Sequence, residues 1–231
     1  MSLVLSLFPG IGLLDMAFEE EGFCIVRGPD LLWGGDIRRF HPPAGAFDGV
    51  IGGPPCQAFS GLANLMRVRG VESENLIPEF ERVVGETQPE WFLMENVSAA
   101  PLPTVAGYIV KDVLLNNRWL GEHQNRVRRF SFGTHDGRPI HPRLAALEPV
   151  EWEHAVTAAH AGDRRVRAKG RIARYSIARA RELQGLPANF LEAAPFTAQG
   201  KLSAIANGVP LPMGRAIAQA VARATGRRPP C

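Results

Sequence analysis

Short apolar runs alternate with helix-like stretches through the first hundred residues, and this alternation constrains the fold more than any other feature. Residues 3–8, 23–26, 45–51 and 91–94 each contain an apolar run of strand length, whereas residues 13–21 and 76–86 have apolar side chains at helical spacing. Strands that alternate with helices favour a doubly wound, mostly parallel sheet. We therefore expect a Rossmann-like α/β fold, in which ligands bind at the carboxyl ends of the strands.

The pattern weakens after residue 133 and returns near residue 175. Residues 134–174 are rich in proline and glycine and contain one expected helix, at residues 151–161. Residues 179–185 and 212–225 again have helical spacing. We therefore expect a catalytic core over residues 1–133, a small inserted basic lobe over 134–174, and a C-terminal part, 175–231, that returns to the core.

Composition excludes several classes of protein. The chain has 231 residues, 45% hydrophobic and 21% charged, which suits a globular domain with its own core. No apolar run approaches the roughly 20 residues that cross a bilayer, and the apolar start lacks the basic residues of a signal peptide. Three cysteines without a Cys/His cluster disfavour a disulfide framework and a zinc site. We expect a cytoplasmic protein without a metal.

Charge is distributed unevenly along the chain. Residues 1–115 contain 7 Lys and Arg against 15 Asp and Glu, and residues 116–231 contain 19 against 8. A basic half indicates a polyanionic partner such as nucleic acid. Six of the cations lie within the 12 residues from 163 to 174, where they either bind phosphates or form a solvated loop.

Two motifs follow the first and third expected strands. Residues 8–12 (Phe-Pro-Gly-Ile-Gly) form either a tight turn or a place where the backbone approaches a ligand beside a helix N-terminus. Residues 52–57 (Gly-Gly-Pro-Pro-Cys-Gln) hold Cys56 on a turn that two prolines stiffen. A thiolate held there can act as a nucleophile, and the alternative is a rigid turn with an incidental thiol.

Two further motifs offer an acid and a polar row. Glu95 ends the fourth strand, where it either caps the next turn or acts as a general acid beside Cys56. Within residues 124–132, alternation places Gln124, Arg126 and Arg128 on one face of a strand. These three side chains either contact an anion or a base, or they place charge on an edge strand and so prevent it from pairing with another chain.

Two later motifs follow, Leu-Gln-Gly-Leu-Pro at 183–187 and Asn-Gly-Val-Pro at 207–210. The order of all these motifs along the chain resembles that of the C5-cytosine DNA methyltransferases. The resemblance implies the S-adenosylmethionine-dependent methyltransferase fold, with S-adenosylmethionine as methyl donor and double-stranded DNA as substrate. It implies that Cys56 adds to C6 of cytosine, which activates C5, and that Glu95 contacts N3 and the exocyclic amine. Arg126 then holds the base and helps to place Glu95, with Gln124 and Arg128 in support.

The resemblance also implies a donor site and a DNA-binding surface. The expected donor contacts are Phe8, Gly10, Gly12, Asp30, Asp36, Ile37, Pro54, Asn207 and Val209, with Asp30 at the ribose. A cytosine in a duplex must be flipped out of the stack before it can react, and residues 59–70 resemble the loop that closes over it. The expected DNA contacts are Ser60, Arg67, Arg69, Arg164, Arg165, Arg167, Lys169 and Arg171.

The chain departs from the family pattern at two places that matter. Leu13 replaces the third glycine of the first motif, and about 40 residues are left for target recognition between Gly133 and Tyr175. So small a lobe makes few groove contacts, which predicts a target of about two to four base pairs. We expect a monomer, and the sequence does not decide between an orphan enzyme and one with a restriction partner.

Two other functions stay open. An RNA (tRNA) cytosine-C5 methyltransferase would share Pro-Pro-Cys-Gln, and an idle accessory protein would bind the donor and DNA without turnover. An exocyclic-amine methyltransferase is disfavoured, because an aromatic residue would then stand where Cys56 follows Pro-Pro.

Overall fold

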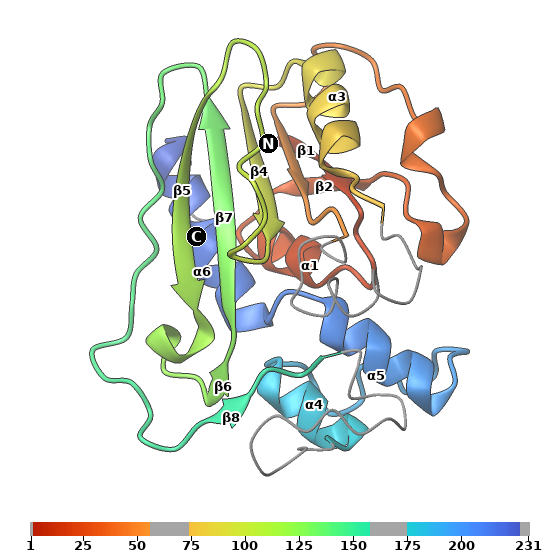
Figure 1. Cartoon of the computed structure of the whole chain (residues 1–231), viewed down its shortest axis with the longest axis vertical. Coiled ribbons are helices and arrows are strands. Elements are labelled where there is room, and N and C mark those ends of the chain that lie inside the picture. The colour runs from red at the N-terminus through yellow and green to blue at the C-terminus, as the bar shows by residue number, and fades with distance from the viewer. Residues whose placement is uncertain (1, 56–73, 158–174, 227–231) are drawn as a thin grey trace.

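The computed structural model describes residues 2–55, 74–157 and 175–226, and a six-stranded sheet lies at its centre (Figure 1). The strands, in the spatial order β2-β1-β3-β4-β7-β5, are β2 (Cys24–Arg27), β1 (Leu3–Leu7), β3 (Gly49–Gly52), β4 (Trp91–Asn96), β7 (Val127–Thr134) and β5 (Ile109–Asn116). The first four are parallel, whereas β7 runs antiparallel to both β4 and β5. The predicted mostly parallel, Rossmann-like sheet is therefore confirmed.

Helices cover both faces of this sheet. α1 (Leu13–Glu20) and α6 (Leu211–Ala224) pack on one face, and α3 (Ile77–Thr87) packs on the other. Successive side chains of β1 point to opposite faces, so Val4 joins the core under α1 and α6 while Leu5 joins the core under α3. Strands buried on both faces explain why these runs are continuously apolar in the sequence.

Two C-terminal helices and a short strand pair from the middle of the chain lie beyond the carboxyl ends of the parallel strands. They comprise α4 (Ile177–Leu183), α5 (Ala198–Asn207) and the short parallel pair β6 (Gln124–Asn125) and β8 (Glu153–His154), at the bottom of Figure 1. Leu13 of α1 belongs to the same buried apolar cluster as Leu183 and Ile205 of these helices. The region therefore closes over the end of the sheet at which ligands bind in this class of fold.

One expected helix is wrong in the part that the structure describes. Residues 151–157 are not helical, and β8 instead pairs with β6, with the amide of Glu153 donating to the carbonyl of His123 at 2.8 Å. The helical spacing of a short segment is a weak preference, and pairing with a distant strand overrides it.

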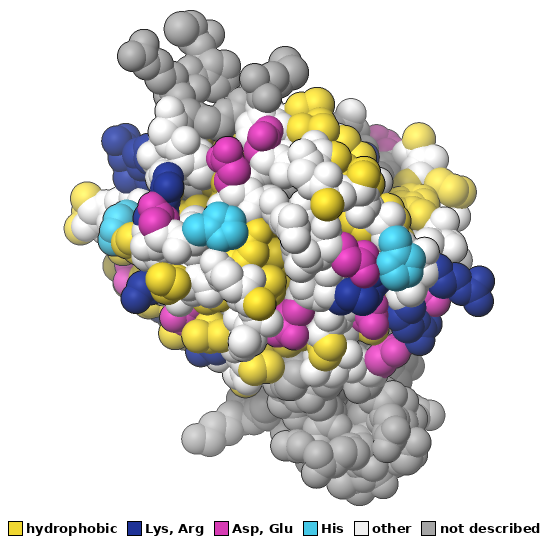
Figure 2. All heavy atoms as spheres, turned by 90° about the horizontal axis from the view of Figure 1, so that it is seen from above, with side chains coloured by type: hydrophobic (Ala, Val, Ile, Leu, Met, Phe, Trp, Pro, Cys, Tyr) yellow, Lys and Arg dark blue, Asp and Glu magenta, His cyan; other side chains and the backbone are white. Residues whose placement is uncertain are grey.

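The opposite end of the sheet has mixed charge. Figure 2 looks onto that end from above and shows basic, acidic and histidine side chains interspersed among the described residues. Such a surface has no field of a single sign to attract a polyanion. Among the described helices, none is long and apolar enough to span a membrane.

Candidate functional site

A cavity of about 450 Å³ lies at the carboxyl ends of the parallel strands. Its wall combines the turns that follow β1, β2 and β3 with the end of β4 and one side of α5. Eight of the nine residues expected to bind a methyl donor line it: Phe8, Gly10, Asp30, Asp36, Ile37, Pro54, Asn207 and Val209. The sequence motifs thus meet in one place although they lie up to 200 residues apart.

The glycine turn after β1 has the unusual backbone that its sequence predicts. Gly10 has a φ of 56°, and a side chain there would meet no atom within 4 Å, so open space borders the backbone. Phe8 also has a positive φ, 55°, which is rare for a bulky residue and typical of functional sites. Gly12 instead faces Arg27, whose Nη2 lies 3.0 Å from the position of an added Cβ, and Gly12 is not part of the cavity wall.

Asp30 fastens the turn after β2 to the turn after β1. Its Oδ2 accepts from the amide of Gly10 at 2.8 Å, and its Oδ1 accepts from the amide of Leu32 at 2.7 Å. The Trp33 indole donates to the carbonyl of Gly10 at 2.8 Å, which adds a second link. A carboxylate offers about four lone-pair sites, so Asp30 retains capacity to accept from a ligand hydroxyl.

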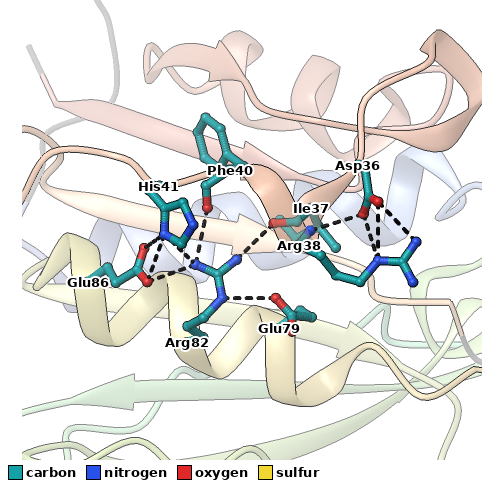
Figure 3. Close-up of polar contacts among 8 residues, drawn as sticks. All are labelled: Asp36, Ile37, Arg38, Phe40, His41, Glu79, Arg82 and Glu86. Carbon is teal, nitrogen blue, oxygen red and sulfur yellow. Dashed lines mark hydrogen bonds and ion pairs between the residues drawn. The ribbon is translucent and has the colours of Figure 1, made fainter.

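The next acid opens a short 3₁₀ turn, η2 (Ile37–Arg39). Asp36 accepts hydrogen bonds from the backbone and side chain of Arg38, and these bonds hold the pKa of Asp36 below its ordinary value (Figure 3). Ile37 is buried and gives the cavity an apolar wall beside this carboxylate. An apolar surface next to an acceptor suits a flat heterocycle that carries an amino group.

Sequence reasoning missed a buried acid at the base of the cavity. Asp15, in the first turn of α1, is 1% exposed and accepts from the Ser6 hydroxyl at 2.5 Å and from the Arg27 guanidinium at 2.9 Å. Burial raises the pKa of Asp15, although Ser6 and Arg27 oppose the shift. An acid on an otherwise apolar helix face was the available signal, but its partners come from two other elements.

The opposite end of the cavity carries an ion pair between neighbouring strands. Nε of Arg128 lies 2.9 Å from Oε1 of Glu95, and the two side chains are 17% and 13% exposed. An added Cβ at Gly53 would lie 3.0 Å from Oε2 of Glu95, so the glycine leaves room for this carboxylate. Pro54 and Pro55, which precede Cys56 in the chain, also line the cavity.

Arg128 forms the ion pair with Glu95, whereas the prediction gave Arg126 the main part in placing Glu95 and Arg128 a supporting one. Arg126 is 3% exposed and donates to the carbonyls of Val156, Ala206 and Gly208 at 2.8, 2.9 and 3.2 Å. The strand is broken here, because β6 ends at Asn125 and β7 begins at Val127. Strict alternation fails at the break, so the two arginines lie in different surroundings.

Gln124 is fully buried beside the same C-terminal elements. Its amide nitrogen donates to the carbonyl of Leu183 at 2.6 Å, and its Oε1 accepts from the amide of Val156 at 3.3 Å. A buried amide with both ends bonded joins the sheet to the C-terminal helices. Both of these bonds are thus to backbone groups outside the cavity wall, and the supporting role predicted for Gln124 stays a prediction.

The remaining predicted site residues lie outside the described residues. They are Cys56, Ser60, Arg67, Arg69, Arg164, Arg165, Arg167, Lys169 and Arg171. Within the described ranges, no group of three or more His, Cys, Asp or Glu side chains could hold a metal ion.

Proteins of known structure share this architecture. A putative DNA modification methyltransferase encoded within an E. coli prophage superposes with a TM-score of 0.66 at 16% identity, covering 98% of this chain and 100% of that one. The chain therefore has the α/β fold of that protein, with its cavity at the carboxyl ends of the strands.

Sequence comparisons then give the family. Residues 34–103 match the model of the C-5 cytosine-specific DNA methylases. The type II methyltransferase M.HgiGI of Herpetosiphon aurantiacus is 32% identical over 122 residues, which is 44% of this chain and 94% of that protein. M.NgoPII of Neisseria gonorrhoeae is 32% identical over 147 residues, 55% of this chain and 38% of that protein. The chain belongs to the C5-cytosine-specific DNA methyltransferase family.

The match does not extend over whole relatives of ordinary length. The chain covers 38%, 52% and 46% of M.NgoPII and of the type II methyltransferases M.HgiDI and M.FnuDI. It thus spans about half the length of these curated relatives.

Proposed function

We propose that this protein methylates C5 of cytosine in double-stranded DNA, with S-adenosylmethionine as the methyl donor and Cys56 as the covalent nucleophile. One observation carries the proposal: the Glu95–Arg128 pair and the Gly-Pro-Pro turn that leads to Cys56 border the same cavity as the proposed donor contacts in the turns after β1 and β2. Donor and base would thus meet where neighbouring strands end.

The residues of the cavity fit S-adenosylmethionine. When bound, this donor supplies an electrophilic methyl group on a sulfonium cation. Asp30 would accept from the ribose hydroxyls, and Ile37 with Asp36 would hold the adenine. Phe8 and the open backbone beside Gly10 would hold the methionine part. The carboxylates along the wall favour a cationic ligand over an anionic one.

The base-side residues would activate the cytosine. The Cys56 thiolate forms a bond to C6, and the electron pair of the C5–C6 double bond becomes available at C5 for the methyl group. Glu95 would hold N3 and the exocyclic amine and stabilise the charge that develops in the ring. Arg128 fixes the orientation of this carboxyl group through the 2.9 Å ion pair. Loss of the C5 proton to a base and of the thiolate from C6 then completes the turnover.

The reaction requires the target base outside the duplex, because C5 and C6 are stacked between neighbouring bases. Ser60, Arg67 and Arg69 would contact DNA near the flipped nucleotide, and Arg164, Arg165, Arg167, Lys169 and Arg171 would bind phosphates. Phosphate contacts position a duplex without reading it, so they support a short target, as does the small lobe over 134–174.

A trapping experiment tests the proposal. A pool of duplexes containing 5-fluorocytosine is incubated with S-adenosylmethionine and the protein, because fluorine at C5 blocks the elimination step. We expect a denaturant-resistant protein–DNA adduct that is lost in Cys56→Ala and kept in Cys24→Ala, which removes an exposed cysteine. Sequencing the trapped duplexes gives the target.

Other outcomes would favour the remaining functions. An adduct with tRNA but not with duplex DNA would support the RNA methyltransferase. Donor binding without any adduct or methyl transfer would support the idle accessory protein.

A further inference from the structure

Arg82 lies on α3, outside the wall of the cavity, yet it contacts the backbone of a segment that lines it. Its Nη2 donates to the carbonyl of Ile37 at 2.8 Å, and its Nη1 donates to the carbonyl of Phe40 at 3.1 Å (Figure 3). Ile37 is the first residue of η2 and Phe40 directly follows its last, and the contacts span more than 40 residues of sequence. One guanidinium therefore connects α3 to the turn that presents Asp36 and Ile37.

Two acids of the same helix hold the guanidinium in place. Nε of Arg82 lies 2.9 Å from Glu79 and Nη1 lies 2.8 Å from Glu86, while Nδ1 of His41 lies 3.2 Å from Nη1. Partial burial disfavours the cation, but the hydrogen bonds and charges of Glu86 and Glu79 outweigh it and raise the pKa of Arg82. Glu79 and Glu86 thus hold the planar guanidinium of Arg82 in the orientation in which it donates to the two carbonyls.

The segment between β2 and β3 needs such an anchor. Its only regular structure is two 3₁₀ turns of three residues each, η1 (Leu31–Trp33) and η2. Turns this short are marginal by themselves, because each has few hydrogen bonds of its own. In η2 the carbonyl of Ile37 accepts from the amide of Phe40 at 3.1 Å and accepts a second bond from Arg82. The Trp33 indole anchors η1 to Gly10, and Arg82 anchors η2.

We propose that Arg82 is a positioning residue for donor binding. It holds η2 so that Asp36 and Ile37 face the adenine part of S-adenosylmethionine, and it does not act in the chemical step. This inference rests on the proposed function, because it assigns the donor to the cavity.

A purely structural role is the competing explanation. The pairs of Arg82 with Glu79 and Glu86 are spaced i,i+3 and i,i+4, and such pairs stabilise a helix slightly without any effect on a ligand. The two explanations differ in what Arg82→Gln does to the donor. A helix-stabilising role lowers the melting temperature alone, whereas a positioning role raises the Kd and KM for the donor and leaves kcat unchanged.

The experiment compares four full-length proteins: wild type, Arg82→Gln, Arg82→Lys and the control Arg118→Gln. Arg118 pairs with Glu148 and is 23% exposed, close to the 26% of Arg82, but it lies outside the cavity wall. Calorimetric titration with S-adenosylhomocysteine gives Kd, methylation kinetics give KM and kcat, and thermal melts confirm folding. Arg82→Lys keeps the charge but cannot bridge both carbonyls, so it serves if Arg82→Gln does not fold.

We expect Arg82→Gln to raise Kd and donor KM by about tenfold, because the variant loses both hydrogen bonds that hold η2. Arg82→Lys should raise both by about threefold, and kcat at saturating donor should stay within about twofold of wild type in both variants. Arg118→Gln should leave Kd unchanged.

Unchanged donor binding in a folded Arg82→Gln or Arg82→Lys protein, or a loss that appears in kcat alone, would overturn the inference and leave the proposed function intact. A wild-type protein that binds neither S-adenosylhomocysteine nor S-adenosylmethionine would instead overturn the proposed function, and the inference with it.

Discussion

Leu13 and Gly208 form a steric pair whose removal can be predicted quantitatively. Leu13 is 2% exposed and occupies the position of the third glycine in the family motif. An added Cβ at Gly208 would lie 2.4 Å from Cδ1 and 2.9 Å from Cγ of Leu13, far inside van der Waals contact. The backbone of Gly208, with φ −73° and ψ 158°, is open to any residue, so only this contact opposes a side chain.

Gly208→Ala is therefore expected to destabilise the fold by overpacking. Displacing a buried leucine by about an ångström costs roughly 1–3 kcal/mol, which lowers the melting temperature of a domain of this size by about 2–12 °C. The carbonyl of Gly208 also accepts from Arg126 and Gln184, so a shift of this residue strains two buried hydrogen bonds.

A double-mutant cycle separates this mechanism from others. Leu13→Ala alone should cost about 2–5 kcal/mol because it leaves a cavity. In that background the clash is absent, so adding Gly208→Ala should cost close to nothing or restore stability. Urea and thermal unfolding of the four proteins measure the coupling. Gly85→Ala on α3 is the control, because its Cβ meets nothing within 4 Å and alanine should stabilise the helix. Additive losses at Leu13 and Gly208 would refute the steric argument.

Three further predictions concern the chemistry, the buried acid and the DNA contact. Cys56→Ala should abolish methyl transfer and keep donor binding. Glu95→Gln should slow methyl transfer about a hundredfold or more and retain the melting temperature. Full activity of Glu95→Gln in a methyl-incorporation assay would remove Glu95 from the mechanism. Burial raises the pKa of Asp15, so the folded state holds the carboxyl proton to a higher pH than the unfolded chain does. The stability that Asp15 contributes is therefore present below its ordinary pKa of 3.8 and is lost as pH rises through the raised pKa. The free energy of unfolding of wild type should therefore fall relative to Asp15→Asn as pH rises above the ordinary pKa of 3.8, and a constant difference in urea titrations would contradict this. DNA affinity should drop steeply with salt if the basic residues between 163 and 174 bind phosphates, and a flat response in a filter-binding assay would exclude that role.

The parts of the fold that could be predicted are those determined by residues close together in the sequence. The apolar runs that end at Pro9 and Gly52 are strands because turn residues stop them, and parallel strands bring their carboxyl ends to one edge of the sheet. That geometry alone placed eight donor-site candidates around one cavity. Gly12 is the exception, because Arg27 of β2 occupies the side of the turn that the motif left open.

The parts that were missed depend on partners distant in sequence. Arg126 and Arg128 have the same local pattern, but Arg126 donates to the carbonyls of Ala206 and Gly208, about 80 residues away, and Arg128 pairs with Glu95. Arg82 looks in the sequence like any helix-surface arginine. Its contact with the carbonyl of Ile37, 45 residues earlier, is what connects it to the cavity.

The polar side chains of the Gln-x-Arg-x-Arg row make two different kinds of contact. Arg128 lines the cavity and pairs with Glu95, whereas Gln124 and Arg126 donate to backbone carbonyls of α4, of α5 and of Gly208, which borders the cavity. Removing a buried donor leaves its acceptors unsatisfied, at a cost of about 1–3 kcal/mol each. A loss of activity on substitution of Arg126 therefore follows from displaced donor contacts on α5 as readily as from a lost base contact. Donor affinity distinguishes the two, because it falls in the first case and is kept in the second.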